Sequence, residues 1–294
     1  MGKLGGEMKA LAKKARGSFK TVDDRIHIVQ RFSRHLRALN IQIQRVEQIK
    51  VRHIECYIQA RLAQGIDKRT LQNEMSALRK VLQQAGRRQV VEHSRLTSKA
   101  VGPAGASRHG TTRAITREYY SRVLEAVRDK DAGLAATLEL ARLMGLRSQE
   151  AVQCCQSLKT WKQALERGET RLTVVFGTKG HRPRETIIQD TGAVKKALEN
   201  ALSVAEQRDG RLIDQPNLQK AMNYWRGEIA KAGLTGDYTP HSLRYAWTQD
   251  ALRHYLAQGF SDKEALALTS MDLGHGDGRG RYVVQVYGRR EEEE

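Results

Sequence analysis

Cysteine, proline and aromatic residues are scarce in this chain of 294 residues, which contains three Cys, four Pro and 5% Phe, Trp and Tyr. The cysteines, Cys56, Cys154 and Cys155, include no CxxC pair, so neither a disulfide framework nor a zinc module is indicated. No apolar stretch approaches the roughly 18 residues of a membrane span, and the basic opening lacks the apolar segment of a secretory signal. We therefore expect a soluble cytoplasmic protein with no membrane association and no bound metal.

Acidic residues are also in deficit, because 33 Asp and Glu stand against 51 Lys and Arg, a formal net charge of +18. Such a balance predicts a polyanionic partner, and nucleic acid fits better than a membrane surface. The excess is concentrated: residues 1–113 contain 24 Lys and Arg and 8 Asp and Glu, whereas residues 114–294 are nearly balanced. We therefore place the basic surface in the first third of the chain and expect association with the nucleoid.

Composition and periodicity divide the chain into four segments. Residues 1–18 are basic and glycine-rich and are predicted to form a flexible arm. Residues 19–92 contain three stretches with apolar residues at steps of three and four, which predict a compact helical domain. Residues 93–113 are rich in small residues, Gly and Pro, as in a linker. Residues 114–294 then form a second domain.

The second domain is predicted to be helical with one small sheet. The β-branched runs 171–176 and 185–188 are joined by a basic glycine-containing segment, which indicates an antiparallel hairpin with a basic tip. Thr239 and Pro240 are typical of a helix start, with Thr as N-cap and Pro as the first helical residue. The expected fold class is thus mainly α with a small antiparallel β-sheet.

The first candidate site lies in the opening turn of the helix that follows Thr239. His241 and Arg244 are three residues apart, so they share one face near the positive end of the helix dipole, a geometry that suits a phosphate. Taken alone, the pair is better explained as an ordinary surface His–Arg pair. A metal site is disfavoured because Arg cannot replace the second ligand of an HxxH pair.

Three further segments follow a recognisable order with this pair. Gly145 precedes Arg147, Lys179 lies at the tip of the predicted hairpin, and Leu273-Gly-His275 precedes a terminal tyrosine. Together these motifs resemble those of the tyrosine recombinases, the family of phage and conjugative-element integrases and chromosome-dimer resolvases. The resemblance covers about residues 114–288 as the catalytic domain, and the basic helical domain before it is similar to the core-binding domain of that family.

The resemblance implies a role for each matched position. Arg147 and Arg244 would bind the scissile phosphate, because guanidinium stays charged and binds phosphate bidentately. Lys179 would protonate the departing 5′-oxygen, His241 would act as general acid/base on the nucleophile, and His275 would hydrogen-bond the transition state. A tyrosine would form a 3′-phosphotyrosine intermediate, with no cofactor. The implied partners are double-stranded DNA, three further copies in a homotetramer on DNA, and accessory directionality or DNA-bending proteins.

The nucleophile has two candidates, since Tyr282 and Tyr287 stand seven and twelve residues after His275, whereas the family interval is commonly about nine. We predict Tyr287, because residues 285–287 resemble the short apolar segment that carries the family's tyrosine. The glycines of residues 276–280 suggest an enlarged turn that absorbs the extra residues. Tyr282 would then begin the helix as a structural aromatic.

Two other readings remain open beside a recombinase that integrates or excises a mobile element. One is a type IB topoisomerase-like enzyme, and the other is a catalytically inactive DNA-binding regulator of the same fold. Glu150, three residues after Arg147, is expected to orient that arginine through a salt bridge. The final GRREEEE is expected to be a solvated tail.

Overall fold

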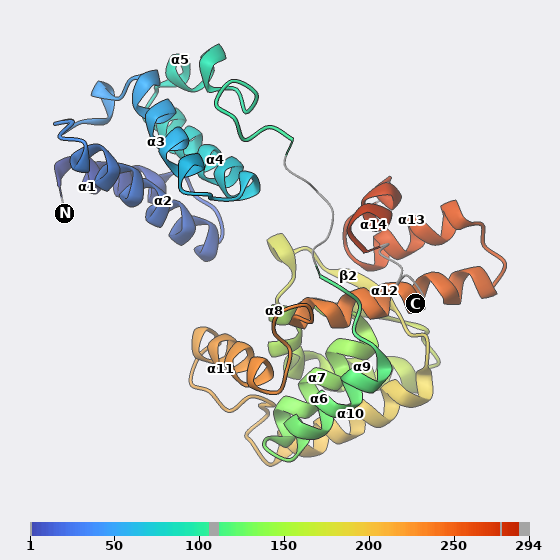
Figure 1. Cartoon of the computed structure of the whole chain (residues 1–294). Helices are drawn as coiled ribbons and strands as arrows, with labels where there is room; N and C mark the ends of the chain where they lie inside the picture. Colours follow the sequence, from blue (N-terminus) through green and yellow to red (C-terminus); the bar gives the residue numbers. More distant parts are fainter. Residues whose placement is uncertain (1, 106–111, 277, 288–294) are drawn as a thin grey trace. The chain divides into compact units, whose positions relative to one another are not determined.

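The computed structural model describes residues 2–105, 112–276 and 278–287. The chain divides into two compact units, residues 1–107 and 108–294, each with a hydrophobic core of its own (Figure 1). The acidic tail and the middle of the predicted linker lie outside the described residues.

The first unit is helical throughout its described part. Ser18 accepts a hydrogen bond from the amide of Thr21, and Asp67 accepts from those of Arg69 and Thr70, so side chains cap its second and fourth helices. The helices are α1 (Lys3–Lys14), α2 (Phe19–Ala38), α3 (Val51–Ala63), α4 (Lys68–Gln84) and α5 (Arg88–Val91), with 3-10 turns at Val46–Gln48 and Ser94–Leu96. The three helices expected within residues 19–92 therefore correspond to α2, α3 and α4.

The predicted flexible arm is wrong, because α1 is part of the first core. Leu4, Met8 and Ala12 recur every four residues along α1 and are buried, and α1 packs against α2 and α4. Arg25 of α2 donates to the carbonyl oxygens of Ala12 and Arg16, both at 3.0 Å, and so ties down the end of α1. The few large apolar residues suffice because the neighbouring helices supply the rest of the apolar surface.

Part of the predicted linker also packs, contrary to expectation. Leu96 and Val101 are buried in the core of the first unit, and the amide of Gln72 donates to the carbonyl of Pro103 at 2.9 Å. Two apolar side chains among small residues, together with the Gln72 hydrogen bond, are enough to attach residues 94–103 to α3 and α4. The chain divides only after Ser107.

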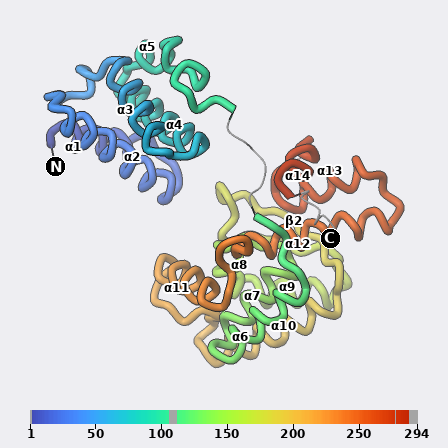
Figure 2. The backbone as a smooth tube through the Cα atoms, viewed as in Figure 1, coloured from blue at the N-terminus to red at the C-terminus, as the bar shows by residue number. Residues whose placement is uncertain are grey.

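The second unit confirms the expected fold class of helices with one small antiparallel sheet. Strands β1 (Arg171–Val174) and β2 (Arg184–Ile187) pair with Arg171 opposite Ile187 and Val174 opposite Arg184. Helix α7 lies at the centre and packs against α6, α10 and α12, as the backbone trace in Figure 2 shows. The helices are α6 (Arg117–Arg128), α7 (Ala132–Met144), α8 (Ser148–Val152), α9 (Leu158–Glu166), α10 (Thr191–Glu206), α11 (Leu218–Lys231), α12 (Pro240–Ala257), α13 (Asp262–Asp272) and α14 (Gly280–Tyr287).

Two local features of this unit fix the end of α7 and the start of α12. Gly145 ends α7 in the left-handed region at φ 59°, and a Cβ there would lie 2.5 Å from the Trp247 ring, so no larger residue fits this close approach. Thr239 caps α12 and Pro240 is its first residue, as expected. Among the described residues, no helix is long and apolar enough to cross a membrane.

Candidate active site

The second unit contains a hollow of about 840 Å³ in which the motif residues meet. Its walls come from segments far apart in the chain: the start of α8, the hairpin tip, the start of α12, the turn after α13, and α14. Predicted site residues that line it are Arg147, Lys179, His241, His275 and Tyr287, together with the alternative Tyr282. The remaining predicted residue, Arg244, is buried directly behind the wall.

Arg147 and Arg244 are held side by side by one carbonyl group. Nη2 of Arg147 donates to the carbonyl of Leu273 at 2.8 Å, and Nη2 of Arg244 donates to the same oxygen. Nη1 of Arg244 donates to the carbonyl of Gly145, the residue that ends α7. Its Nε has no partner among the described groups although it is fully buried. The two guanidinium groups therefore concentrate positive charge at one wall of the hollow.

Glu150 orients Arg147, as the sequence suggested. Its carboxylate is 1% exposed and accepts from Arg147 Nη1 at 2.7 Å and from Arg184 Nη2 at 2.7 Å. Burial by itself raises the pKa of Glu150, but the charges of Arg184, Arg244 and Arg147 outweigh it and lower the pKa to about 2. The group is therefore a fixed anion at neutral pH rather than a proton carrier.

Arg184 is a site residue that the sequence reasoning missed. It is 6% exposed and, besides Glu150, donates to the carbonyl of Asp272 at 2.6 Å and to that of Gly145 at 3.1 Å. In the sequence Arg184 stands at the end of the basic hairpin tip, where it resembles the neighbouring surface cations. Only its position beside the β-branched run indicated that its side chain could face inward, where it would need buried hydrogen-bond acceptors.

The two histidines are neutral at pH 7. Partial removal from water, with the charges of Arg244 and Arg147, lowers the pKa of His241 to about 4, although part of the residue stays accessible. The same causes, with Arg279 and Lys179 added, lower the pKa of His275 to about 3. Each imidazole can therefore accept a proton or a hydrogen bond at neutral pH.

The two candidate tyrosines differ in their contacts. Tyr287 is 3% exposed, and its hydroxyl lies 3.2 Å from Nε2 of His275. Its ring also packs against those of Tyr245 and His241, with centroids 4.6 and 5.9 Å apart. Tyr282 is 38% exposed and meets His275 only edge to ring, at 4.8 Å between centroids. A hydroxyl with an adjacent proton acceptor is thus present at Tyr287.

Lys179 lies in a 3-10 turn at the hairpin tip (Lys179–His181) and is exposed on the rim of the hollow. Its ammonium makes no ion pair with any described carboxylate, so it is available to a ligand. No group of three or more His, Cys, Asp or Glu side chains among the described residues could hold a metal ion. The site can therefore offer an anion several cationic donors, a buried hydroxyl and neutral imidazoles.

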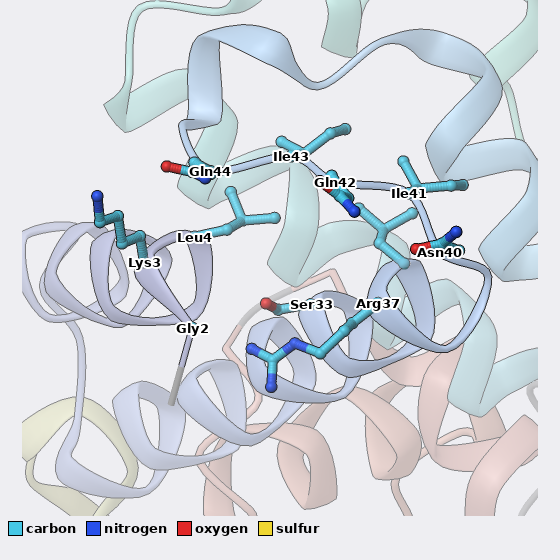
Figure 3. A pocket seen from close by; sticks show the side chains of 11 residues that line it. Gly2, Lys3, Leu4, Ser33, Arg37, Asn40, Ile41, Gln42, Ile43 and Gln44 are labelled. Carbon is cyan, nitrogen blue, oxygen red and sulfur yellow. The ribbon is translucent and has the colours of Figure 1, made fainter.

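A second hollow, of about 510 Å³, lies in the first unit between the starts of α1 and of the segment after α2 (Figure 3). Leu4 and Ile41 contribute apolar surface, while Lys3 and Arg37 bring positive charge to its edge. The described residues that line it include the hydroxyl of Ser33 but no His, Asp, Glu or Cys, so we assign the chemistry to the hollow of the second unit.

Comparison with known proteins covers both units. A family profile described as "Phage integrase, N-terminal" matches residues 1–91, and one described as "Integrase" matches residues 102–250. Among curated proteins, no sequence matches the chain.

Several solved structures share the fold. A lambda integrase tetramer bound to a Holliday junction is 18% identical with a TM-score of 0.61, over 98% of this chain and 79% of that one. XerH recombinase in a pre-cleavage complex with its difH substrate is 17% identical with a TM-score of 0.59, over 98% and 83%. The Tn1549 transposon integrase in complex with circular intermediate DNA is 13% identical with a TM-score of 0.56, over 97% and 96%. At such identities these likenesses show a common fold.

Proposed function

Because this chain belongs to the phage integrase family of tyrosine recombinases, we propose that it is a site-specific DNA recombinase that cleaves and rejoins strands through a 3′-phosphotyrosine. The observation that carries the proposal is the meeting of Tyr287, His275, Arg147 and Lys179 around one hollow, with Arg244 behind it. We propose further that it acts on double-stranded DNA as a homotetramer in the integration or excision of a mobile element, with accessory directionality or DNA-bending proteins. The lambda integrase tetramer on a Holliday junction supports this assembly.

The proposed cleavage step uses each group for one task. The Tyr287 hydroxyl oxygen attacks the scissile phosphorus, the bond from phosphorus to the 5′-oxygen breaks, and the departing 5′-oxygen takes a proton from Lys179. Arg147 and Arg244 stabilise the charge on the non-bridging oxygens. Attack of another strand's 5′-hydroxyl on the phosphotyrosine reverses these transfers and rejoins the DNA.

The proton of Tyr287 goes to His275 in this proposal. The resemblance gave the role of general base to His241, but the 3.2 Å contact with the tyrosine hydroxyl favours His275. His241, whose ring lies 5.9 Å from that of Tyr287, then helps to pack the nucleophile and contact the phosphate. The low pKa of both imidazoles keeps them unprotonated before the reaction.

The test is covalent trapping on nicked suicide duplexes prepared from random genomic DNA. We expect the wild type to form a protein–DNA adduct whose modified peptide contains phosphorylated Tyr287, found by mass spectrometry. Tyr287→Phe should abolish the adduct, because no hydroxyl remains beside His275, while Tyr282→Phe, the matched control, should retain most of it.

Other outcomes separate the remaining readings. An adduct that survives Tyr287→Phe and disappears in Tyr282→Phe would transfer the nucleophile to Tyr282. Absence of any adduct despite DNA binding would support an inactive regulator. Cleavage with religation only of the original strand, never joining to a second duplex, would support a topoisomerase.

A further inference from the structure

Within residues 2–105, 112–276 and 278–287, no anion balances three cations on the rim of the hollow. Lys179, Arg182 and Arg279 all line it, and none of their side chains forms a hydrogen bond or ion pair with the described residues. By contrast, Arg147 and Arg184 on the same wall are paired with Glu150. The unpaired rim charges are therefore those that can bind a phosphate without first breaking an internal ion pair.

The backbone of Arg279 is held at the start of α14. The hydroxyl of Ser270 donates to the carbonyl of Gly276 at 3.1 Å, which attaches the preceding turn to α13. After the turn, a Cβ on Gly280 would lie 3.3 Å from Cβ of Leu266, so α14 also begins in close contact with α13. Arg279 is thus carried between two anchored points.

The same residue opens the helix that ends at Tyr287. The carbonyl of Arg279 accepts hydrogen bonds from the amides of Tyr282 at 2.9 Å and Val283 at 3.2 Å, the first amide bonds of α14. The helix extends from Gly280 to Tyr287, about 12 Å at 1.5 Å per residue. A ligand that holds Arg279 therefore acts on the helix carrying the tyrosine hydroxyl.

We propose that Arg279 binds a DNA phosphate next to the scissile one and thereby positions α14 for attack by Tyr287. The inference rests on the proposed function only in taking this hollow as the place where DNA is cut. A guanidinium suits the role because its planar fork binds phosphate bidentately and fixes orientation as well as charge. The charge of Arg279 also contributes to the lowered pKa of His275, which agrees with its closeness to the reacting groups.

The binding test compares Arg279→Ala with Arg281→Ala in the full-length protein. Arg281 is the matched control, since it is exposed two residues further on but does not line the hollow. Dissociation constants for a duplex of genomic sequence are measured between 50 and 200 mM salt. We expect the slope of log K against log salt to be shallower by about 0.9 in Arg279→Ala and unchanged in Arg281→Ala, as for the loss of one phosphate contact. Equal slopes for both variants and the wild type would overturn the contact.

The location test uses duplexes in which one phosphate at a time is replaced by an uncharged methylphosphonate. Neutralising the phosphate next to the cleavage position should weaken wild-type binding and leave Arg279→Ala unaffected. The same sensitivity in both proteins at every position would refute the assignment.

The positioning test is single-turnover cleavage at saturating DNA. We expect Arg279→Ala to be slower by on the order of 10- to 100-fold, because a small misplacement of a nucleophile has effects of this size. Arg279→Lys should keep the salt slope and recover only part of the rate. An unchanged rate in Arg279→Ala would overturn the positioning role. If the wild type forms no adduct at all, the proposed function fails, whereas the salt slopes still decide the phosphate contact.

Discussion

Arg184 shares its hydrogen-bond acceptors with both arginines of the site. It reaches Glu150, which also binds Arg147, and the carbonyl of Gly145, which also binds Arg244. Because it begins β2, five residues after Lys179, it also connects the hairpin to this wall. The Arg184 guanidinium thus contacts groups that hold both arginines, while its backbone belongs to the hairpin that carries Lys179.

At this scale we predict that Arg184→Met lowers single-turnover cleavage by roughly 100-fold while changing DNA affinity little, because Glu150 and the Gly145 carbonyl, which hold Arg147 and Arg244, lose the guanidinium that fixes them. The variant should also lose about 3 kcal/mol in its free energy of unfolding, since Glu150 stays charged and buried with one partner fewer. The measurements are trapping kinetics and urea unfolding. Glu150→Gln combined with Arg184→Met serves as control: it should regain stability without regaining cleavage. Wild-type cleavage by Arg184→Met would contradict the positioning role.

At the scale of elements, helix α1 is an integral part of the first unit. A segment expected to extend freely is instead a helix whose apolar side completes the core formed with α2 and α4. Its lysines therefore occupy definite places on the surface of a folded unit. Lys13 and Lys14 lie in the last turn of α1, where positive charge stabilises the helix by interacting with the negative end of its dipole.

The corresponding prediction concerns Met8, which is fully buried in α1. Met8→Ala should lower the free energy of unfolding of the first unit by about 2–4 kcal/mol, because it removes buried apolar surface and leaves a cavity. Lys13→Ala, an exposed position on the same helix, should change it by no more than about 0.5 kcal/mol. Chemical unfolding followed by circular dichroism compares the two. Equal, small effects of both substitutions would show that residues 1–18 form a flexible arm after all.

At the scale of the whole molecule, charge and chemistry are divided between the two units. The excess of basic residues falls within residues 1–113, whereas the hollow with its tyrosine lies in the second unit. Since binding to DNA is dominated by phosphate contacts, most of the DNA affinity should come from the first unit. The role of the first unit as a DNA core-binding domain remains a prediction.

The test is removal of residues 1–107, the boundary at which the chain divides. The remaining chain should stay folded, because it has its own core, but its affinity for DNA should fall by roughly 1,000-fold or more. The intact protein should lose affinity by a similar factor between 50 and 200 mM salt if about six phosphates are contacted. Circular dichroism and fluorescence anisotropy provide the readouts. A truncated chain that binds as tightly as the parent would place the DNA-binding surface in the second unit.

The sequence alone was enough for the family, the fold class and most elements. Helical periodicity, the Thr239 cap and the β-branched runs around the basic tip depend on residues close together in the chain, so they are legible without a structure. The order of the motifs from Arg147 to His275 can likewise be read from the sequence alone.

What only the tertiary structure decided is which distant groups meet. Met8 is buried because other helices cover it, and Arg184 turns inward because its acceptors lie 34 to 88 residues away. The Leu273 carbonyl meets Arg147 across 126 residues of chain. The choice of Tyr287 as the hydroxyl beside His275 depends on how α14 leaves its turn. Burial and hydrogen bonding are properties of contacts between segments, and no pattern within one segment specifies its partner.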